Sequence, residues 1–194
     1  MIKNKKILIT GGLGFIGSHL TEELLRLPNK IYLIDNFTTR KKIKLNFINK
    51  HKGKITLIKS GIAQYIKLEK LIKKVDIIYH LAASMGVENV IKKKPTNSIL
   101  NNLKSTELIF KFSAKHNKRV IFASSSEVYG LNSKTLVEDA RPNLGNPKIM
   151  RWSYAYSKLT EEFLAMSYFK EKNLKVTVVR LFNTVGEGQT NKNG

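Results

Sequence analysis

The chain has 194 residues, 42% of them hydrophobic, with 35 lysines and arginines against 14 aspartates and glutamates, a formal net charge of +21. The length fits one domain, the apolar content excludes a disordered chain, and the lack of cysteine excludes disulfides, thiolate metal sites and a cysteine nucleophile. No apolar run approaches the roughly 20 residues of a membrane-spanning helix, so we expect a cytoplasmic protein.

The excess of positive charge raises the question of a nucleic-acid partner. Only six of the basic residues are arginine, and the chain is also rich in isoleucine and asparagine, a composition that A/T-rich codons produce without selection for binding. The lysines lie in short clusters that do not alternate with aromatic residues, as a single-strand binder requires. We therefore expect neither nucleic acid nor membrane as a partner.

Strand-like apolar runs alternate with helix-length segments along the chain. The strands are predicted at Lys6–Thr10, Ile31–Asp35, Ile55–Lys59, Val75–Leu81, Arg119–Ser124 and Lys175–Leu181. The helices are predicted at Phe15–Leu27, Lys41–Asn49, Tyr65–Lys73, Asn97–His116 and Tyr154–Lys172. This order predicts an α/β fold, a doubly wound parallel sheet with helices on both faces. The long irregular stretch Leu131–Arg151 is expected to be functional.

A glycine-rich turn directly follows the first predicted strand. Gly11, Gly14 and Gly17 have the spacing of a dinucleotide-binding turn, and Phe15 and Ile16 lie within it. Glycines let a pyrophosphate approach the backbone, and the helix N-terminus that follows supplies N–H groups and a positive dipole end. The context of a strand before and a helix after favours a Rossmann-type nucleotide site over a tight turn without a ligand.

An acidic residue ends the second predicted strand, 18 residues after the last glycine of the turn. Asp35, followed by Asn36, is placed to accept hydrogen bonds from the adenosine ribose and to repel a 2′-phosphate, which predicts NAD rather than NADP. The alternative is an ordinary loop aspartate.

Hydroxyl and carboxyl groups gather where the fifth predicted strand ends, at Ser124, Ser125, Ser126 and Glu127. The carboxyl ends of parallel strands form the ligand-binding edge of an open α/β sheet. A role at a binding site is therefore favoured over a turn or helix-capping role.

Tyr154 and Lys158 are four residues apart and share one face of the last long predicted helix. An ammonium beside a phenol lowers the tyrosine pKa, and a tyrosine with a lowered pKa can remove a proton from a sugar hydroxyl. Tyr168 and Lys172 have the same spacing, but Tyr168 lies roughly 21 Å further down the helix at about 1.5 Å per residue. We therefore predict that Tyr168 has a packing role.

These motifs together resemble the extended short-chain dehydrogenase/reductases that modify nucleotide sugars, and the likeness spans nearly the whole chain. The similar segments are TGGLGFIGSHL at Thr10–Leu20, IDNFTTR at Ile34–Arg40, HLAA at His80–Ala83, NLKST at Asn102–Thr106, SSSEVYG at Ser124–Gly130, YAYSK at Tyr154–Lys158 and RLFN at Arg180–Asn183.

The resemblance implies NAD as cofactor, a nucleotide-sugar substrate that is UDP-linked, and oxidation of the sugar at C4 to a 4-keto intermediate. It implies Tyr154 as the base, Lys158 as its partner and Ser125 as the catalytic hydroxyl. Ser126 and Glu127 are similar to the T-S-E-VYG segment of UDP-glucuronate decarboxylases and the T-D-E-VYG segment of dTDP-glucose 4,6-dehydratases. The implied cofactor contacts are Gly11, Gly14, Phe15, Ile16, Gly17, Asp35, Asn36, Leu81, Ala82, Ala83, Tyr154 and Lys158, and the implied substrate contacts are Ser125 and Asn183.

Three features depart from that family. Ile62 stands where members often have an aspartate that touches the adenine, and Gly186-Glu187 replaces the usual Gly-Pro. The chain ends at Gly194, before the part that holds most nucleotide-sugar contacts in members. We therefore expect residues 1–194 to form an NAD-binding domain with the catalytic residues, its C-terminal substrate-binding part absent or truncated.

Two outcomes of the chemistry remain open, UDP-sugar 4-epimerase and UDP-glucuronate decarboxylase, with a dehydratase ranked third. The alternative from another class is a non-catalytic NAD-binding module, a truncated relative of these enzymes. The four histidines lack ligand spacing, so no metal is expected. A homodimer through the helices Asn97–His116 and Tyr154–Lys172 is expected from the resemblance.

Overall fold

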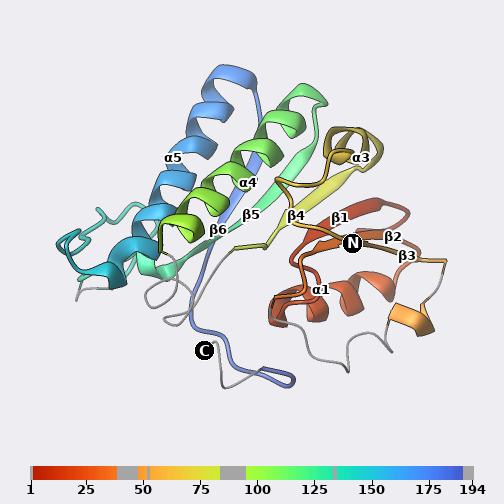
Figure 1. The fold of residues 1–194 in the computed structure, drawn as a ribbon, viewed down its shortest axis with the longest axis horizontal. Helices are drawn as coiled ribbons and strands as arrows, with labels where there is room; N and C mark the ends of the chain where they lie inside the picture. The colour runs from red at the N-terminus through yellow and green to blue at the C-terminus, as the bar shows by residue number, and fades with distance from the viewer. Residues whose placement is uncertain (1, 39–47, 52, 84–94, 133–134, 190–194) are drawn as a thin grey trace.

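A parallel six-stranded sheet forms the centre of the molecule (Figure 1). The computed structural model describes residues 2–38, 48–51, 53–83, 95–132 and 135–189. The strands stand in the order β3-β2-β1-β4-β5-β6, which is the order of a Rossmann fold. They comprise β1 (Lys6–Thr10), β2 (Lys30–Asp35), β3 (Ile55–Lys59), β4 (Ile77–His80), β5 (Arg119–Ser125) and β6 (Lys175–Leu181).

Helices cover both faces of the sheet, as the sequence predicts. In Figure 1, α4 and α5 lie side by side on one face, with α3 beyond them, and α1 lies on the other. The α-helices are α1 (Phe15–Leu25), α3 (Leu68–Lys74), α4 (Pro95–Lys115) and α5 (Ser153–Lys172), and two 3₁₀ helices are η2 (Ser126–Tyr129) and η3 (Met150–Trp152).

Each face of the sheet has its own apolar core. On the α4 and α5 side, Phe110 and Phe122 pack edge to face with ring centroids 5.5 Å apart, and both side chains are fully buried. On the α1 side, Leu24 and Leu25 pack with the buried strand residues of β1 and β2. Continuous Ile, Val and Leu runs suit these strands because both of their faces are covered.

The element ends differ from the sequence prediction in a few places. The fourth strand begins two residues later than predicted, because Val75 caps α3 and its N–H bonds to carbonyls of that helix. The 3₁₀ helices η2 and η3 lie in stretches for which the sequence predicts neither a helix nor a strand. The predicted helix Lys41–Asn49 falls mainly outside the described residues, which are helical at 48–50. No helix in the described ranges is long and apolar enough to cross a lipid bilayer.

Candidate active site

The predicted site segments follow the carboxyl ends of neighbouring strands. The glycine turn follows β1, Leu81–Ala83 follows β4, and Ser125 is the last residue of β5. Because β1, β4 and β5 are adjacent and parallel, these ends lie along one edge of the sheet. This is the edge at which open α/β sheets bind ligands.

The glycine turn has the close packing of a nucleotide-binding turn. Gly11 adopts a left-handed φ of 69°, and a Cβ on it would stand 3.0 Å from the backbone N and Cα of Ala82. A Cβ on Gly17 would collide with the Gly11 carbonyl oxygen and stand 2.8 Å from the Gly12 Cα. Gly14 is the N-cap of α1 and offers no side chain above the helix end. The first N–H groups of the helix have no partner within it, so the turn fits the pyrophosphate of a dinucleotide.

Asp35 ties the glycine turn to the end of β2. The carboxylate is 7% exposed and accepts the Leu13 N–H at 3.0 Å through Oδ2 and the Phe37 N–H at 2.8 Å through Oδ1. Each oxygen has a second lone pair, which suits a ribose hydroxyl as donor. Asn36 is exposed, and its Oδ1 accepts the N–H and hydroxyl of Thr38 at 3.2 and 2.9 Å. The preference for NAD over NADP stays a prediction.

The serines at the end of β5 have different surroundings: Ser124 packs into the fold, and Ser125 faces the candidate site. The Ser124 hydroxyl is buried and donates to Glu162 Oε1 at 2.5 Å, away from the cluster. The Ser125 Oγ accepts the Glu127 N–H at 3.2 Å, and the Ser125 side chain interacts with the Tyr154 phenol. The structure therefore brings Ser125 and Tyr154 together, two residues that the sequence places 29 positions apart.

The pKa of Tyr154 is raised, which corrects the expectation that its lysine neighbour lowers it. Burial is the largest cause, and the carboxylates of Glu161 and Glu127 add to it, because both charges oppose a phenolate. The Ser125 hydroxyl acts in the opposite direction and lowers the pKa of Tyr154.

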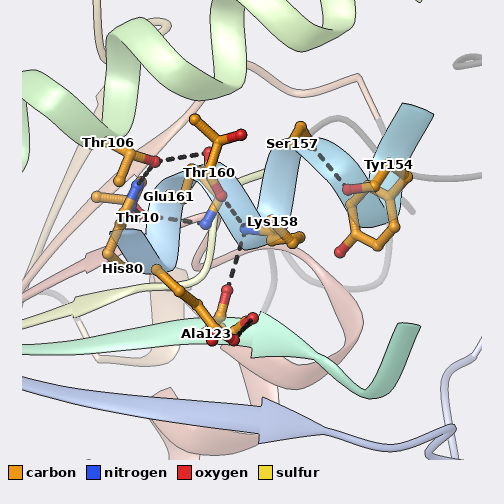
Figure 2. A network of polar contacts seen from close by, with 12 residues as sticks. Thr10, His80, Thr106, Ala123, Tyr154, Ser157, Lys158, Thr160 and Glu161 are labelled. Carbon is orange, nitrogen blue, oxygen red and sulfur yellow. Dashed lines mark hydrogen bonds and ion pairs between the residues drawn. The ribbon is translucent and has the colours of Figure 1, made fainter. Parts of the chain in front are cut away.

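The Lys158 side chain points toward the sheet, where its ammonium contacts Ala123 and Glu161 (Figure 2). Its side chain is 3% exposed, its Nζ donates to the Ala123 carbonyl at 3.0 Å, and it forms an ion pair of 2.8 Å with Glu161 Oε2. The ammonium also lies 4.7 Å from the centre of the Phe122 ring, a favourable cation–π position. The counter-charge of Glu161 explains physically why Lys158 does not dominate the pKa of Tyr154.

Sequence reasoning missed Glu161, which is fully buried beside Lys158. The spacing of three residues on one helix was the available signal, since residues i and i+3 are neighbours on a helix surface. Glu127, in contrast, lies near the site as proposed and pairs with Arg151 at 3.5 Å between Oε2 and Nη1. This pair joins η2 to η3, the segment that leads into α5.

The remaining predicted residues lie as follows. Tyr168 packs against the core near Phe110, and its hydroxyl donates to Glu107 Oε1 at 3.1 Å, so the packing role is confirmed. Asn183 is exposed just beyond the end of β6, and Ile62 is 5% exposed within the core. Ser126 belongs to η2, Phe15 and Ile16 begin α1, and Leu81, Ala82 and Ala83 are half-buried after β4.

Residues 7–194 match the model of a protein family described as the NAD dependent epimerase/dehydratase family. The chain belongs to this family. Among curated relatives of the family, the UDP-N-acetyl-alpha-D-glucosaminuronate decarboxylase of Bacillus cytotoxicus is 39% identical over 182 residues, which are 94% of this chain and 55% of the relative. The chain therefore spans about half the length of that protein.

Two solved members of the epimerase/dehydratase family share the fold. A UDP-N-acetylglucosamine 4-epimerase from Methanobrevibacter ruminantium M1, in complex with UDP-N-acetylmuramic acid, has a TM-score of 0.86 and 31% identity and covers 100% of this chain and 60% of its own. A UDP-glucuronic acid 4-epimerase from Bacillus cereus, in complex with UDP-glucuronic acid and NAD, has a TM-score of 0.77 and 32% identity over 90% of this chain and 55% of its own. NAD is the cofactor of the family, and the packed glycine turn and Asp35 fit it.

Proposed function

We propose that this chain carries the cofactor and catalytic half of an enzyme that oxidises a UDP-linked sugar at C4. The observation that carries the proposal is the interaction of the Ser125 side chain with the Tyr154 phenol at the ligand-binding edge of the sheet. The two hydroxyls come from different elements and lie beside the end of β5, where a sugar hydroxyl can bond to both. The family and its UDP-sugar relatives support this assignment.

The chemistry that these residues perform is proton removal from the C4 hydroxyl. NAD, when bound, accepts the hydride from C4. Tyr154 takes the hydroxyl proton as a phenolate, which the positive nicotinamide ring of bound NAD would favour against the burial and carboxylates that raise its pKa. Ser125 holds the same hydroxyl in position, and C4 becomes a carbonyl carbon. Lys158 anchors the base-bearing turn of α5 to the Ala123 carbonyl at the end of β5. Gly11, Gly14 and Gly17 would hold the pyrophosphate, and Asp35 the adenosine ribose.

The fate of the 4-keto intermediate separates an epimerase from a decarboxylase, and both stay within the proposal. The Bacillus cytotoxicus relative is a decarboxylase, whereas the Methanobrevibacter ruminantium and Bacillus cereus structures are 4-epimerases. Glu127 and Ser126, on η2 next to Ser125, supply the extra polar groups that a decarboxylase uses. Product analysis after incubation with UDP-glucuronate and UDP-glucose distinguishes a pentose product from a C4 epimer.

The homodimer is proposed to form through α4 and α5. Large apolar side chains on these helices are exposed: Leu100 is 60%, Phe163 69% and Phe169 57% accessible. Leu100 and Phe163 line a common apolar groove between the two helices with Leu103 and Leu164. Light scattering of the protein should report twice the chain mass. The cytoplasmic location and the lack of a nucleic-acid partner also stay predictions.

The variant Tyr154→Phe tests the assignment of the base. It removes the phenol hydroxyl, and turnover of the UDP-sugar should fall roughly 10²–10⁴-fold, the usual share of general acid–base catalysis. NAD binding should persist, because the glycine turn is untouched. The matched control is Tyr168→Phe on the same helix, which should retain turnover.

Wild-type turnover by Tyr154→Phe would overturn the assignment. A wild-type protein that binds NAD but turns over no UDP-sugar would instead support the non-catalytic module.

A further inference from the structure

A chain of buried polar side chains runs from the glycine turn to the base-bearing helix (Figure 2). The Thr10 hydroxyl contacts His80 Nδ1 at 2.8 Å, and His80 Nε2 contacts the Thr106 hydroxyl at 3.0 Å. Thr106 donates to Glu161 Oε1 at 2.9 Å, and Glu161 Oε2 is paired with Lys158 at 2.8 Å. All five side chains are at most 3% exposed. The chain thus links the ends of β1 and β4 with α4 and α5.

The direction of every hydrogen bond in this chain follows from the charge of Glu161. A carboxylate only accepts, so Thr106 must donate to it and must accept from His80 Nε2–H. A neutral His80 then has an unprotonated Nδ1, which accepts from the Thr10 hydroxyl. Burial and the nearby Lys158 charge lower the pKa of His80 to about 3, which keeps the ring neutral. The Thr10 oxygen in turn accepts the Ala82 N–H at 3.2 Å.

From this arrangement we propose that Glu161 is a positioning residue for the proposed base. Its carboxylate holds the Lys158 ammonium toward Ala123 and neutralises it, and it opposes a negative charge on Tyr154. The inference rests on the proposed function of Tyr154 and Lys158. It adds Glu161 to Lys158 as a charged group that affects how readily Tyr154 ionises, beside the larger effect of burial.

The groups that act on Tyr154 come from several elements. Glu161 lies on its own helix, Glu127 lies on η2, and Ser125 ends β5. Glu127 is partly exposed and paired with Arg151, whereas Glu161 is buried with Lys158. Burial weakens solvent screening, so the charge of Glu161 acts at greater strength than an exposed charge at similar range.

The substitution Glu161→Gln tests the inference in the cofactor-free protein. Glutamine keeps the shape and an acceptor for Thr106 but removes the charge. The phenolate-to-phenol ratio of Tyr154 should then rise about tenfold at a fixed alkaline pH, corresponding to a shift of roughly one pH unit. The readout is tyrosinate absorbance, taken as the difference between each protein and the same protein carrying Tyr154→Phe. In active enzyme the acid limb of the pH–rate profile should move to lower pH by the same amount.

Two comparison variants separate charge from packing. Thr106→Val removes the hydrogen bond to His80 but keeps the Glu161 charge. The phenolate-to-phenol ratio of Tyr154 should therefore stay at its wild-type value. Glu171→Gln removes an exposed charge near the other end of α5 and should also leave it unchanged. An unchanged ratio in folded Glu161→Gln protein would overturn the inference.

A second measurement needs no substitution and covers the case in which Glu161→Gln does not fold. Nitrogen-15 NMR of histidine-labelled wild-type protein should show His80 neutral, with the proton on Nε2. A proton on Nδ1, or on both nitrogens at neutral pH, would overturn the inference, because the bond directions require an ionised Glu161.

Neither this measurement nor the tyrosinate readout uses NAD or sugar. A failure of the proposed function would instead appear as a lack of turnover, with both readouts unaffected.

Discussion

His80 should make the stability of the folded protein depend on pH in a defined window. Its ring is fully buried between the Thr10 and Thr106 hydroxyls, and burial lowers its pKa from 6.5 to about 3. The unfolded chain binds a proton near pH 6.5, whereas the folded protein binds it only near pH 3. The stability that the neutral ring allows is therefore complete above pH 6.5 and is lost as the pH falls from about 6.5 toward 3.

The size of the effect follows from proton linkage. One proton taken up by the unfolded chain alone changes the free energy of unfolding by about 1.4 kcal/mol per pH unit. Between pH 7 and pH 5 the loss attributable to His80 integrates to about 2 kcal/mol. The substitution His80→Gln removes the titrating ring while keeping a donor and an acceptor, so the variant should lose about 2 kcal/mol less than wild type over this range.

Urea unfolding at pH 5, 6 and 7 measures the difference. The exposed His19→Gln is the matched control and should follow the wild-type pH dependence. The absolute stability of His80→Gln is expected to be lower, and the comparison uses only the slope of stability against pH. Parallel wild-type and His80→Gln curves would contradict the prediction, since they would mean that His80 titrates alike in the folded and unfolded states.

Two further predictions concern the cofactor site and the ion pair between Arg180 and Glu162. Asp35→Ala should weaken NAD binding by roughly 1.5–3 kcal/mol, the range for a hydrogen bond to a charged group, and should narrow the preference for NAD over NADP in calorimetric titration. Wild-type binding of both cofactors by the variant would count against the assignment. The Arg180 guanidinium forms a bidentate ion pair with the Glu162 carboxylate at 2.8–3.3 Å and donates to the Glu138 carbonyl at 2.8 Å. Arg180→Gln should therefore cost about 2–4 kcal/mol of unfolding free energy, because it leaves the Glu162 carboxylate with the Ser124 hydroxyl but without its counter-charge. A loss under about 0.5 kcal/mol, the usual size for a surface change, would contradict this role.

The sheet and the ligand-binding edge were predictable because their signals are local. Continuous apolar runs mark the buried strands, and the alternation of strands and helices fixes a parallel sheet. Parallel strands end at one edge, so the residues after β1, β4 and β5 could be placed together before any side chain was located. Gly11 and Ser125 lie along that edge for this reason.

The direction in which a charged side chain points was not predictable from spacing. Tyr154 and Lys158 share a helix face, yet Lys158 turns to Ala123 and Glu161, and the Tyr154 pKa rises where the pair alone predicts a fall. The side of the sheet on which Ser124 lies was, in contrast, predictable from the sequence. Ser124 continues the buried Val120–Phe122 face of β5, and the period of two along a strand assigns it to the helix side, where Glu162 meets it.

An isotope effect shows whether the site removes hydrogen from C4 of a UDP-sugar. Wild-type protein with bound NAD is mixed rapidly with UDP-glucuronate deuterated at C4 or at C5, and the rise of NADH absorbance is followed. We expect deuterium at C4 to slow this rise and deuterium at C5 to leave it unchanged. A rise that is insensitive to deuterium at C4, or no rise in protein that binds both NAD and the sugar, would contradict oxidation at C4 by this site.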